Sequence, residues 1–131
     1  MKIAQDTGPG GNRFTGYGEG YVEVNRTRHT QSLVVGSDQL LVDWPAASVQ
    51  SLNADHIAAL VGLAPEIVLL GTGPTFVFPE PALLAPLYKA GIGVEVMDTP
   101  AACRTFNILL AEGRNVVAAL IVKSPIEGGR Q

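Results

Sequence analysis

The chain is organised around residues 94–110, which read Val94-Glu95-Val96-Met97-Asp98-Thr99-Pro100-Ala101-Ala102-Cys103-Arg104-Thr105-Phe106-Asn107-Ile108-Leu109-Leu110. A short apolar strand leads into a turn at residues 98–100, and a helical pattern follows. Proline fits the first helical position because its missing N–H would have no partner there, so we expect Thr99 to be the N-cap. One face of this helix is apolar, whereas Arg104 and Asn107 lie three residues apart on the other face. These two side chains can therefore reach the same group.

Apolar runs and helical patterns alternate on both sides of this stretch. Residues 67–70 form an uninterrupted apolar run, a helical pattern covers residues 81–90, and residues 116–122 form a last apolar run. A further helix, with Asn53 as its N-cap, precedes them. Strands that alternate with helices of about ten residues are typical of parallel crossovers. This part of the sequence predicts β-α-β-α-β units in an α/β layer.

The N-terminal third has a different pattern. Residues 21–25 alternate between polar and apolar, residues 26–28 can turn, and residues 29–35 can return as a partner strand, followed by a short strand at 40–44. This pattern predicts an antiparallel hairpin before the parallel units. With 131 residues, we expect a single α/β domain over residues 17–123, a flexible arm over residues 1–16 and a flexible tail over residues 124–131.

Composition excludes several classes of function. The net charge is −3, and the nine basic residues are dispersed, which argues against a nucleic-acid partner. The single cysteine cannot form an internal disulfide, and residues 1–6 lack the apolar core of a signal peptide, so we expect a cytoplasmic protein. The longest apolar run is far shorter than the ~20 residues that span a bilayer, so we expect no direct membrane insertion.

Gly71-Thr72-Gly73 follows a buried strand, where backbone N–H groups can hold an anion. The spacing matches no nucleotide fingerprint, and the sequence favours a turn that needs glycine for positive φ and close packing. Cys103 lies in the first turn of a helix, where the dipole can stabilise a thiolate, but it borders an apolar face and no histidine is near in sequence. We therefore favour a packing role for Cys103 over a catalytic one.

Polar residues near the central helix supply the other candidate site. Asp98 ends a parallel strand, at the edge where open α/β sheets bind ligands. Glu95 interrupts an apolar strand, so we expect Glu95 or Asp98 to pair with Arg104, either as structural support or as half of a small polar pocket. Phe76 and Phe78, beside the glycine turn, belong either to the core or to an exposed binding patch. No metal-ligand spacing and no cofactor motif are found, and no catalytic residue is assigned.

Several ordered motifs carry a family resemblance, and they cover about residues 17–122. The most specific are Met97-Asp98-Thr99-Pro100-Ala101-Ala102-Cys103-Arg104-Thr105-Phe106-Asn107-Ile108-Leu109 and Glu112-Gly113-Arg114-Asn115-Val116; Ser32-Leu33-Val34-Val35, Trp44 and Leu70-Gly71-Thr72-Gly73 precede them. With these motifs the chain resembles the small α/β domain family that includes mitochondrial complex I assembly factor 3 and the adipogenesis-associated Mth938 domain-containing proteins. The resemblance implies a three-layer domain with a mixed sheet and no established reaction. It also implies, for the eukaryotic branch, a role in building a membrane-bound respiratory complex through protein partners.

Two functions follow as hypotheses. The first is a non-enzymatic domain that binds a protein partner through residues 71–78 and the edge formed by Asp98, Arg104 and Asn107. A component of a membrane complex under assembly is one partner of this kind. The second is a small-molecule or anion-binding protein, or an unrecognised enzyme, that uses the Gly71–Gly73 turn and the same edge of Asp98, Arg104 and Asn107. In this hypothesis the backbone donors of Gly71 and Gly73 bind the ligand, Arg104 is a charge clamp and Asn107 orients the ligand. A homo-oligomer is compatible with either hypothesis.

Overall fold

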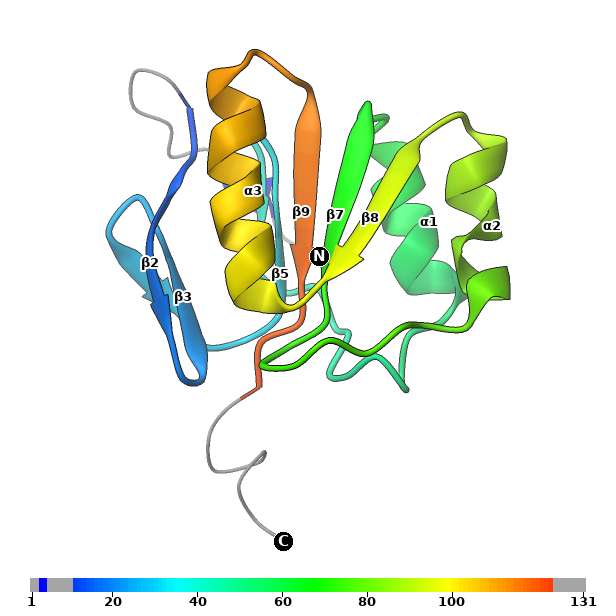
Figure 1. The fold of residues 1–131 in the computed structure, drawn as a ribbon, viewed down its shortest axis with the longest axis horizontal. Coiled ribbons are helices and arrows are strands. Elements are labelled where there is room, and N and C mark those ends of the chain that lie inside the picture. The colour runs from blue at the N-terminus through cyan, green and yellow to red at the C-terminus, as the bar shows by residue number, and fades with distance from the viewer. Residues whose placement is uncertain (1–2, 5–10, 124–131) are drawn as a thin grey trace, which may run out of the picture.

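A computed structural model describes residues 3–4 and 11–123 of the chain (Figure 1). The helices are α1 (Ala54–Gly62), α2 (Pro81–Lys89) and α3 (Thr99–Ala111). The strands are β1 (Ile3–Ala4), β2 (Phe14–Gly18), β3 (Tyr21–Val24), β4 (Thr27–His29), β5 (Leu33–Val35), β6 (Leu40–Leu41), β7 (Ile67–Gly71), β8 (Gly93–Met97) and β9 (Val116–Leu120).

Six of these strands form one mixed sheet, in the order β1-β6-β5-β9-β7-β8. β7 pairs in parallel with both β8 and β9, whereas β5 pairs antiparallel with β9 and with β6. β7 and β9 are almost entirely apolar because both faces of the sheet are covered where they lie. The mixed sheet and the predicted β-α-β-α-β order are confirmed.

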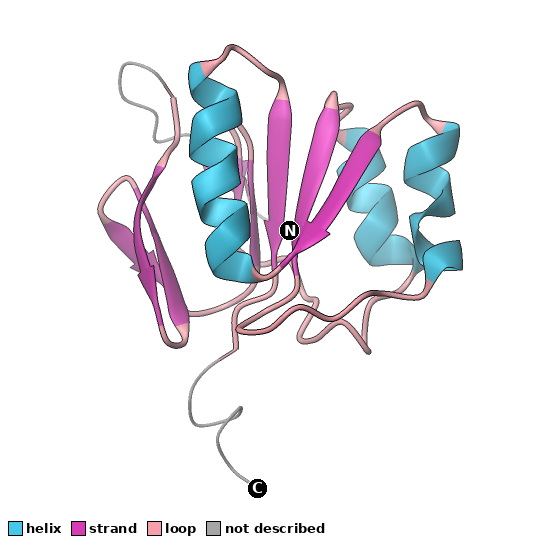
Figure 2. Cartoon of the chain, viewed as in Figure 1, coloured by secondary structure: helices cyan, strands magenta, loops and turns pink. Residues whose placement is uncertain are grey.

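The helices lie on both faces of this sheet (Figures 1 and 2). α1 and α2 pack against each other on one face, over a core that includes Leu60, Leu84 and Val117. α3 packs on β7 and β9 on the opposite face, with Phe106 fully buried in the second core. The predicted α/β class with a mixed sheet is confirmed.

A second, three-stranded sheet, ordered β2-β3-β4, packs against the flank of α3. Val22 and Val24 of β3 point into the core beside α3, and Phe14 of β2 meets Phe106 edge-on at 5.3 Å between ring centroids. The small sheet thus closes the α3 side of the molecule (Figure 1).

Two predictions for the N-terminal third are wrong in detail. The predicted arm, residues 1–16, extends too far, because Phe14 begins β2 and is 5% exposed in the core. The predicted hairpin turns at Asn25 and Arg26, whose φ values of 51° and 70° are those that a two-residue turn between twisted strands requires. The partner strand of the hairpin is therefore β4 alone. β5, which was predicted to continue it, joins the large sheet. Residues 1–2 and 5–10 of the arm and the predicted tail, residues 124–131, lie outside the described residues.

The helix starts can be compared with the sequence predictions one by one. Asn53 caps α1 as predicted, and its side chain accepts the N–H of His56 at 3.0 Å. The N-cap of α3 is Asp98 and not Thr99: Asp98 has an extended backbone and its Oδ1 accepts the N–H of Ala101 at 2.8 Å. The carboxylate therefore satisfies a donor that no helical carbonyl can reach.

Candidate functional site

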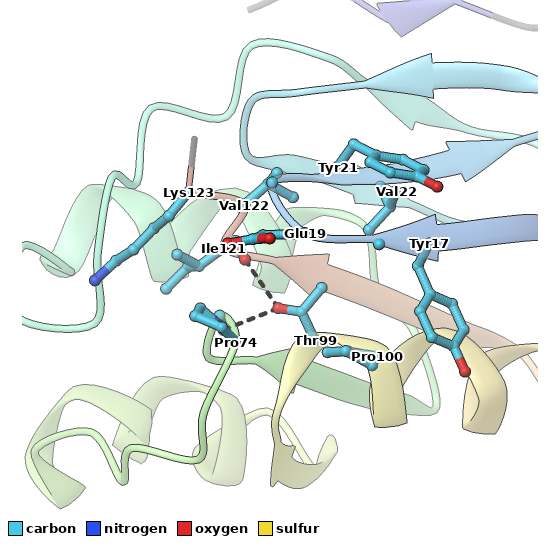
Figure 3. A pocket seen from close by; sticks show the side chains of 13 residues that line it. Tyr17, Glu19, Tyr21, Val22, Pro74, Thr99, Pro100, Ile121, Val122 and Lys123 are labelled. Carbon is cyan, nitrogen blue, oxygen red and sulfur yellow. Dashed lines mark hydrogen bonds between the residues drawn. The ribbon is translucent and has the colours of Figure 1, made fainter. Parts of the chain in front are cut away.

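A pocket of about 430 Å³ opens between the small sheet and the carboxyl ends of the parallel strands (Figure 3). The β2–β3 hairpin forms one wall. The loop after β7, the start of α3 and the segment after β9 form the other. The lining residues are Tyr17, Gly18, Glu19, Gly20, Tyr21, Val22, Gly73, Pro74, Thr99, Pro100, Ile121, Val122 and Lys123. The site lies where open α/β sheets place their ligands, just beyond the carboxyl edge of the strands.

Thr99 ties together the three segments on the sheet side of the pocket. Its hydroxyl accepts the N–H of Gly73 at 2.9 Å and donates to the carbonyl of Ile121 at 2.8 Å, as the dashed lines in Figure 3 show. The backbone N–H of Thr99 also donates to the carbonyl of Gly73 at 2.9 Å. Because Thr99 is only 6% exposed, these bonds are shielded from water and fix this wall of the pocket.

The glycine turn predicted as a candidate anion site is built for close packing. A Cβ at Gly71 would lie 2.8 Å from Leu120 Cδ2 and 2.9 Å from Thr99 Oγ1, so only glycine fits there. The N–H of Thr72 donates to the carbonyl of Met97 at 2.9 Å, and the N–H of Gly73 is bound by Thr99. These two donors are therefore satisfied within the protein, and of the three turn residues Gly73 alone lines the pocket.

Arg104 and Asn107, whose spacing allows them to reach one common group, bind two different residues of the same strand, β2. Arg104 Nη1 donates to the hydroxyl of Tyr17 at 2.8 Å. The side-chain amide of Asn107 accepts the N–H of Phe14 at 2.9 Å and donates to its carbonyl at 2.8 Å. Both side chains thus attach the small sheet to α3, and through it they position the hairpin wall of the pocket.

The predicted ion pair of Arg104 with Glu95 or Asp98 is wrong. Asp98 caps α3, and Glu95 is exposed on β8, so it carries no desolvation cost that a partner must offset. The hydrogen bond that Arg104 donates to the Tyr17 hydroxyl is the main cause that raises the pKa of Arg104 above its ordinary value, with the charge of Asp98 a smaller one.

Cys103 is fully buried on the sheet-facing side of α3. Burial raises the pKa of its thiol to about 12, and the nearby charge of Arg104 opposes this only in part. The thiol is therefore protonated at neutral pH and is a poor nucleophile, which agrees with the packing role that we favoured from the sequence.

Phe76 and Phe78 are 57% and 56% exposed, and their ring centroids lie 6.2 Å apart. Their loop is held by Thr72, whose hydroxyl donates to the carbonyl of Thr75 at 2.7 Å and accepts the N–H of Val77 at 3.1 Å. The same loop contributes Pro74 to the pocket. An apolar loop whose conformation is fixed by the Thr72 hydroxyl therefore borders the pocket.

Sequence reasoning missed the hairpin wall of the pocket, because residues 1–16 were assigned to a flexible arm and no strand was predicted before residue 21. The signal was present: Tyr17-Gly18-Glu19-Gly20-Tyr21 places glycines between two aromatic residues. Gly20 has a φ of 82°, and Gly18 lies against the ring of Tyr21, where a Cβ would come within 2.6 Å. Glycine at positions 18 and 20 is therefore required, at Gly20 for the positive φ of the turn and at Gly18 for the close approach of the Tyr21 ring.

The described residues contain no group of His, Cys, Asp and Glu side chains placed to hold a metal ion. No helix within residues 11–123 has the length and apolar character needed to cross a membrane.

The comparisons with known proteins agree with this architecture. A family model described as a protein of unknown function (DUF498/DUF598) matches residues 14–121. Since the match begins at Phe14, it includes the small sheet and the lining residues of the pocket up to Ile121. The solution NMR structure of a Mth938-like domain protein from Bordetella pertussis is 33% identical, with a TM-score of 0.76 over 100% of this chain and 99% of that chain.

Two curated relatives have descriptive names. NADH dehydrogenase (ubiquinone) 1 alpha subcomplex assembly factor 3 of Bos taurus is 42% identical over 93 residues, which are 70% of this chain and 49% of that protein. The chain thus spans about half the length of the assembly factors that it matches. The 13 kDa major membrane protein of Francisella tularensis is 30% identical over 109 residues, covering 82% of this chain and 89% of that protein.

Proposed function

Since the chain belongs to the DUF498/DUF598 family of proteins of unknown function, we propose that it binds a protein partner as an assembly factor does, and that it is not an enzyme. The observation that carries the proposal is the exposed aromatic pair, Phe76 and Phe78, on the loop that borders the pocket. The names of the complex I assembly factors among its relatives support this class of role. We further propose that the partner is a component of a membrane-bound complex and that binding takes place on the cytoplasmic side.

The aromatic pair is the first part of the proposed surface. Phe76 and Phe78 expose more than half of their area. Large apolar groups that gather on a surface mark interaction sites. Aromatic side chains, Phe among them, are enriched in protein interfaces, and truncation of a central hot-spot residue costs about 2 kcal/mol or more.

The pocket is the second part. Pro74 lines it, and Phe76 follows two residues later, so their Cα atoms lie within about 7 Å of each other by chain length alone. The walls are largely apolar, with Val22, Pro100 and Ile121 among them. An apolar side chain of the partner can fill the pocket while the neighbouring residues of the partner cover Phe76 and Phe78.

The candidate residues on α3 contribute indirectly. Arg104 and Asn107 hold β2, and Asp98 caps α3. In this proposal they keep the hairpin wall in place and do not themselves contact the partner.

The test is a capture experiment with a matched surface control. The tagged chain, the double variant Phe76→Ser/Phe78→Ser and the control Tyr88→Ser are incubated with a lysate of the native organism, membranes included. Tyr88 is 55% exposed at the end of α2 and tests whether loss of any exposed aromatic residue matters. Mass spectrometry should find a stoichiometric partner that the wild type and the control retain and that the double variant loses. A partner retained equally by all three, or no partner for any, contradicts the proposal.

The size of the pocket favours a second candidate function, the binding of a small apolar molecule. Its volume of about 430 Å³ lies within the roughly 300–1,000 Å³ of ligand pockets. Native mass spectrometry of the protein purified from its own organism tests this. A non-covalent adduct that disappears on denaturation supports the second candidate, and a mass equal to that of the bare chain removes it.

A further inference from the structure

β8 is the last strand of the large sheet and pairs with β7 on one side. Within residues 3–4 and 11–123 no strand pairs with its other side. The register with β7 is regular from Gly93 to Met97, without a bulge, and the strand contains no proline. β8 therefore has a straight, open edge of the kind that can accept another strand.

The hydrogen bonds at the two ends of β8 show which backbone groups face this edge. The N–H of Gly93 donates to the carbonyl of Glu66 at 3.1 Å, and the carbonyl of Met97 accepts the N–H of Thr72 at 2.9 Å. Both residues thus direct their backbone groups toward β7. Since this direction alternates along a strand, the N–H and carbonyl groups of Val94 and Val96 point to the open edge.

One face beside this edge is also uncovered. α3 packs on β7 and β9, while the small sheet lies on the far flank of α3 from β8 (Figure 1). Glu95 is exposed at the centre of β8. The surface next to the edge therefore carries one carboxylate.

The charge of Glu95 argues against a second copy of the chain as the occupant. An antiparallel pairing of two β8 strands that uses all four free groups must join Val94 to Val96 of the other copy. This register puts Glu95 opposite Glu95 in a non-hydrogen-bonded pair, where side chains come closest. Like charges directly opposite each other destabilise a strand pair, whereas opposite charges stabilise it.

We propose that the β8 edge binds an extended segment of another protein, which pairs with the backbone of Val94 and Val96 and places a lysine or arginine beside Glu95. This edge is separate from the pocket and from the aromatic pair, so the inference goes beyond the proposed function and is tested without the unidentified partner.

The probe is the peptide acetyl-Thr-Val-Lys-Val-Thr-amide, titrated into the ¹⁵N-labelled full chain at low ionic strength. The expected result is saturable chemical-shift changes, in the millimolar range, centred on the amides of Val94 and Val96. The same peptide with glutamate in place of lysine should bind at least about threefold more weakly. In the variant Glu95→Lys the glutamate peptide should bind more tightly than the lysine peptide. This reversal of the two affinities tests the charge contact with the strand backbone intact.

Val96→Pro is the control for strand pairing, since it removes an N–H that faces the open edge and leaves the bonds to β7 in place. It should abolish binding of both peptides while the far-UV circular dichroism stays unchanged. If it unfolds, the charge reversal in Glu95→Lys decides alone. Equal affinity for both peptides, shifts located elsewhere, or no binding of either peptide overturns the inference. A wild-type dimer in sedimentation equilibrium that Val96→Pro abolishes also overturns the inference, because a second copy of the chain then occupies the edge.

Discussion

The side-chain amide of Asn107 binds both backbone groups of Phe14, at 2.9 and 2.8 Å, across 93 residues of sequence. It acts as a strand partner for a residue at the start of β2, and it fixes the small sheet to α3. The hairpin wall of the pocket depends on this attachment.

Asn107→Ala should therefore lower the free energy of unfolding by about 1–3 kcal/mol, because it leaves the partly buried N–H and carbonyl of Phe14 without partners. Urea unfolding followed by circular dichroism measures the change. Asn115→Ala is the control: its amide makes an exposed contact of 3.4 Å to Ala64, and it should cost less than about 0.5 kcal/mol. Equal effects of the two substitutions would mean that the bonds to Phe14 contribute little.

Thr99→Val should destabilise the protein more than Thr99→Ser. Valine keeps the shape but leaves the buried N–H of Gly73 and the carbonyl of Ile121 unsatisfied, at a cost of about 1–3 kcal/mol. Serine keeps both bonds and loses one methyl group, which costs about 1 kcal/mol. Urea unfolding of both variants tests this order, and the reverse order contradicts a structural role for the hydroxyl.

Gly71→Ala should be destabilising by about 1–3 kcal/mol, since its Cβ would meet Leu120 and Thr99 at 2.8–2.9 Å. Gly62→Ala is the matched control in α1, where a new Cβ meets nothing within 4 Å. The control should raise stability by about 0.4–1 kcal/mol through the unfolded state. Thermal melts of the two variants should move in opposite directions, and a shift in the same direction would show that close packing at Gly71 does not decide the outcome.

Local patterns were sufficient to predict the parallel half of the fold. The apolar runs of β7 and β9, the glycine turn at Gly71 and the proline at the start of α3 each report their own conformation, because burial and turn geometry act on neighbouring residues. The resemblance of residues 97–109 to a known family indicated the same fold.

The N-terminal third could not be predicted in the same way. β2 has little periodicity of its own, and it is held by Asn107 and Arg104, which lie 93 and 87 residues further along the chain. The candidate site has the same limitation: the spacing grouped Arg104 with Asn107, but the residues that they bind, Tyr17 and Phe14 of β2, are distant in sequence. The pocket formed by that contact was therefore missed.

Cys103 should not react with a thiol reagent such as DTNB in the folded protein at pH 8. Burial raises the pKa of the thiol to about 12, so almost no thiolate is present, and the side chain is inaccessible. Addition of denaturant should restore one reactive thiol per chain. Stoichiometric labelling of the native protein within minutes would contradict the packing role.

His29 should make the protein less stable as the pH falls below about 6.5. Burial lowers the pKa of His29 from its ordinary value of 6.5, and its buried Nε2 has no hydrogen-bond partner among the described residues. Between the lowered pKa and 6.5 the unfolded chain binds a proton that the folded chain does not, so the free energy of unfolding decreases as the pH decreases through this window. Above 6.5 both states are neutral at this residue and its contribution is constant. Urea unfolding between pH 5 and 8 should show this loss in the wild type, and His29→Gln, which cannot take up the proton, should reduce it. An identical pH profile for the two proteins would show that the imidazole titrates alike in both states.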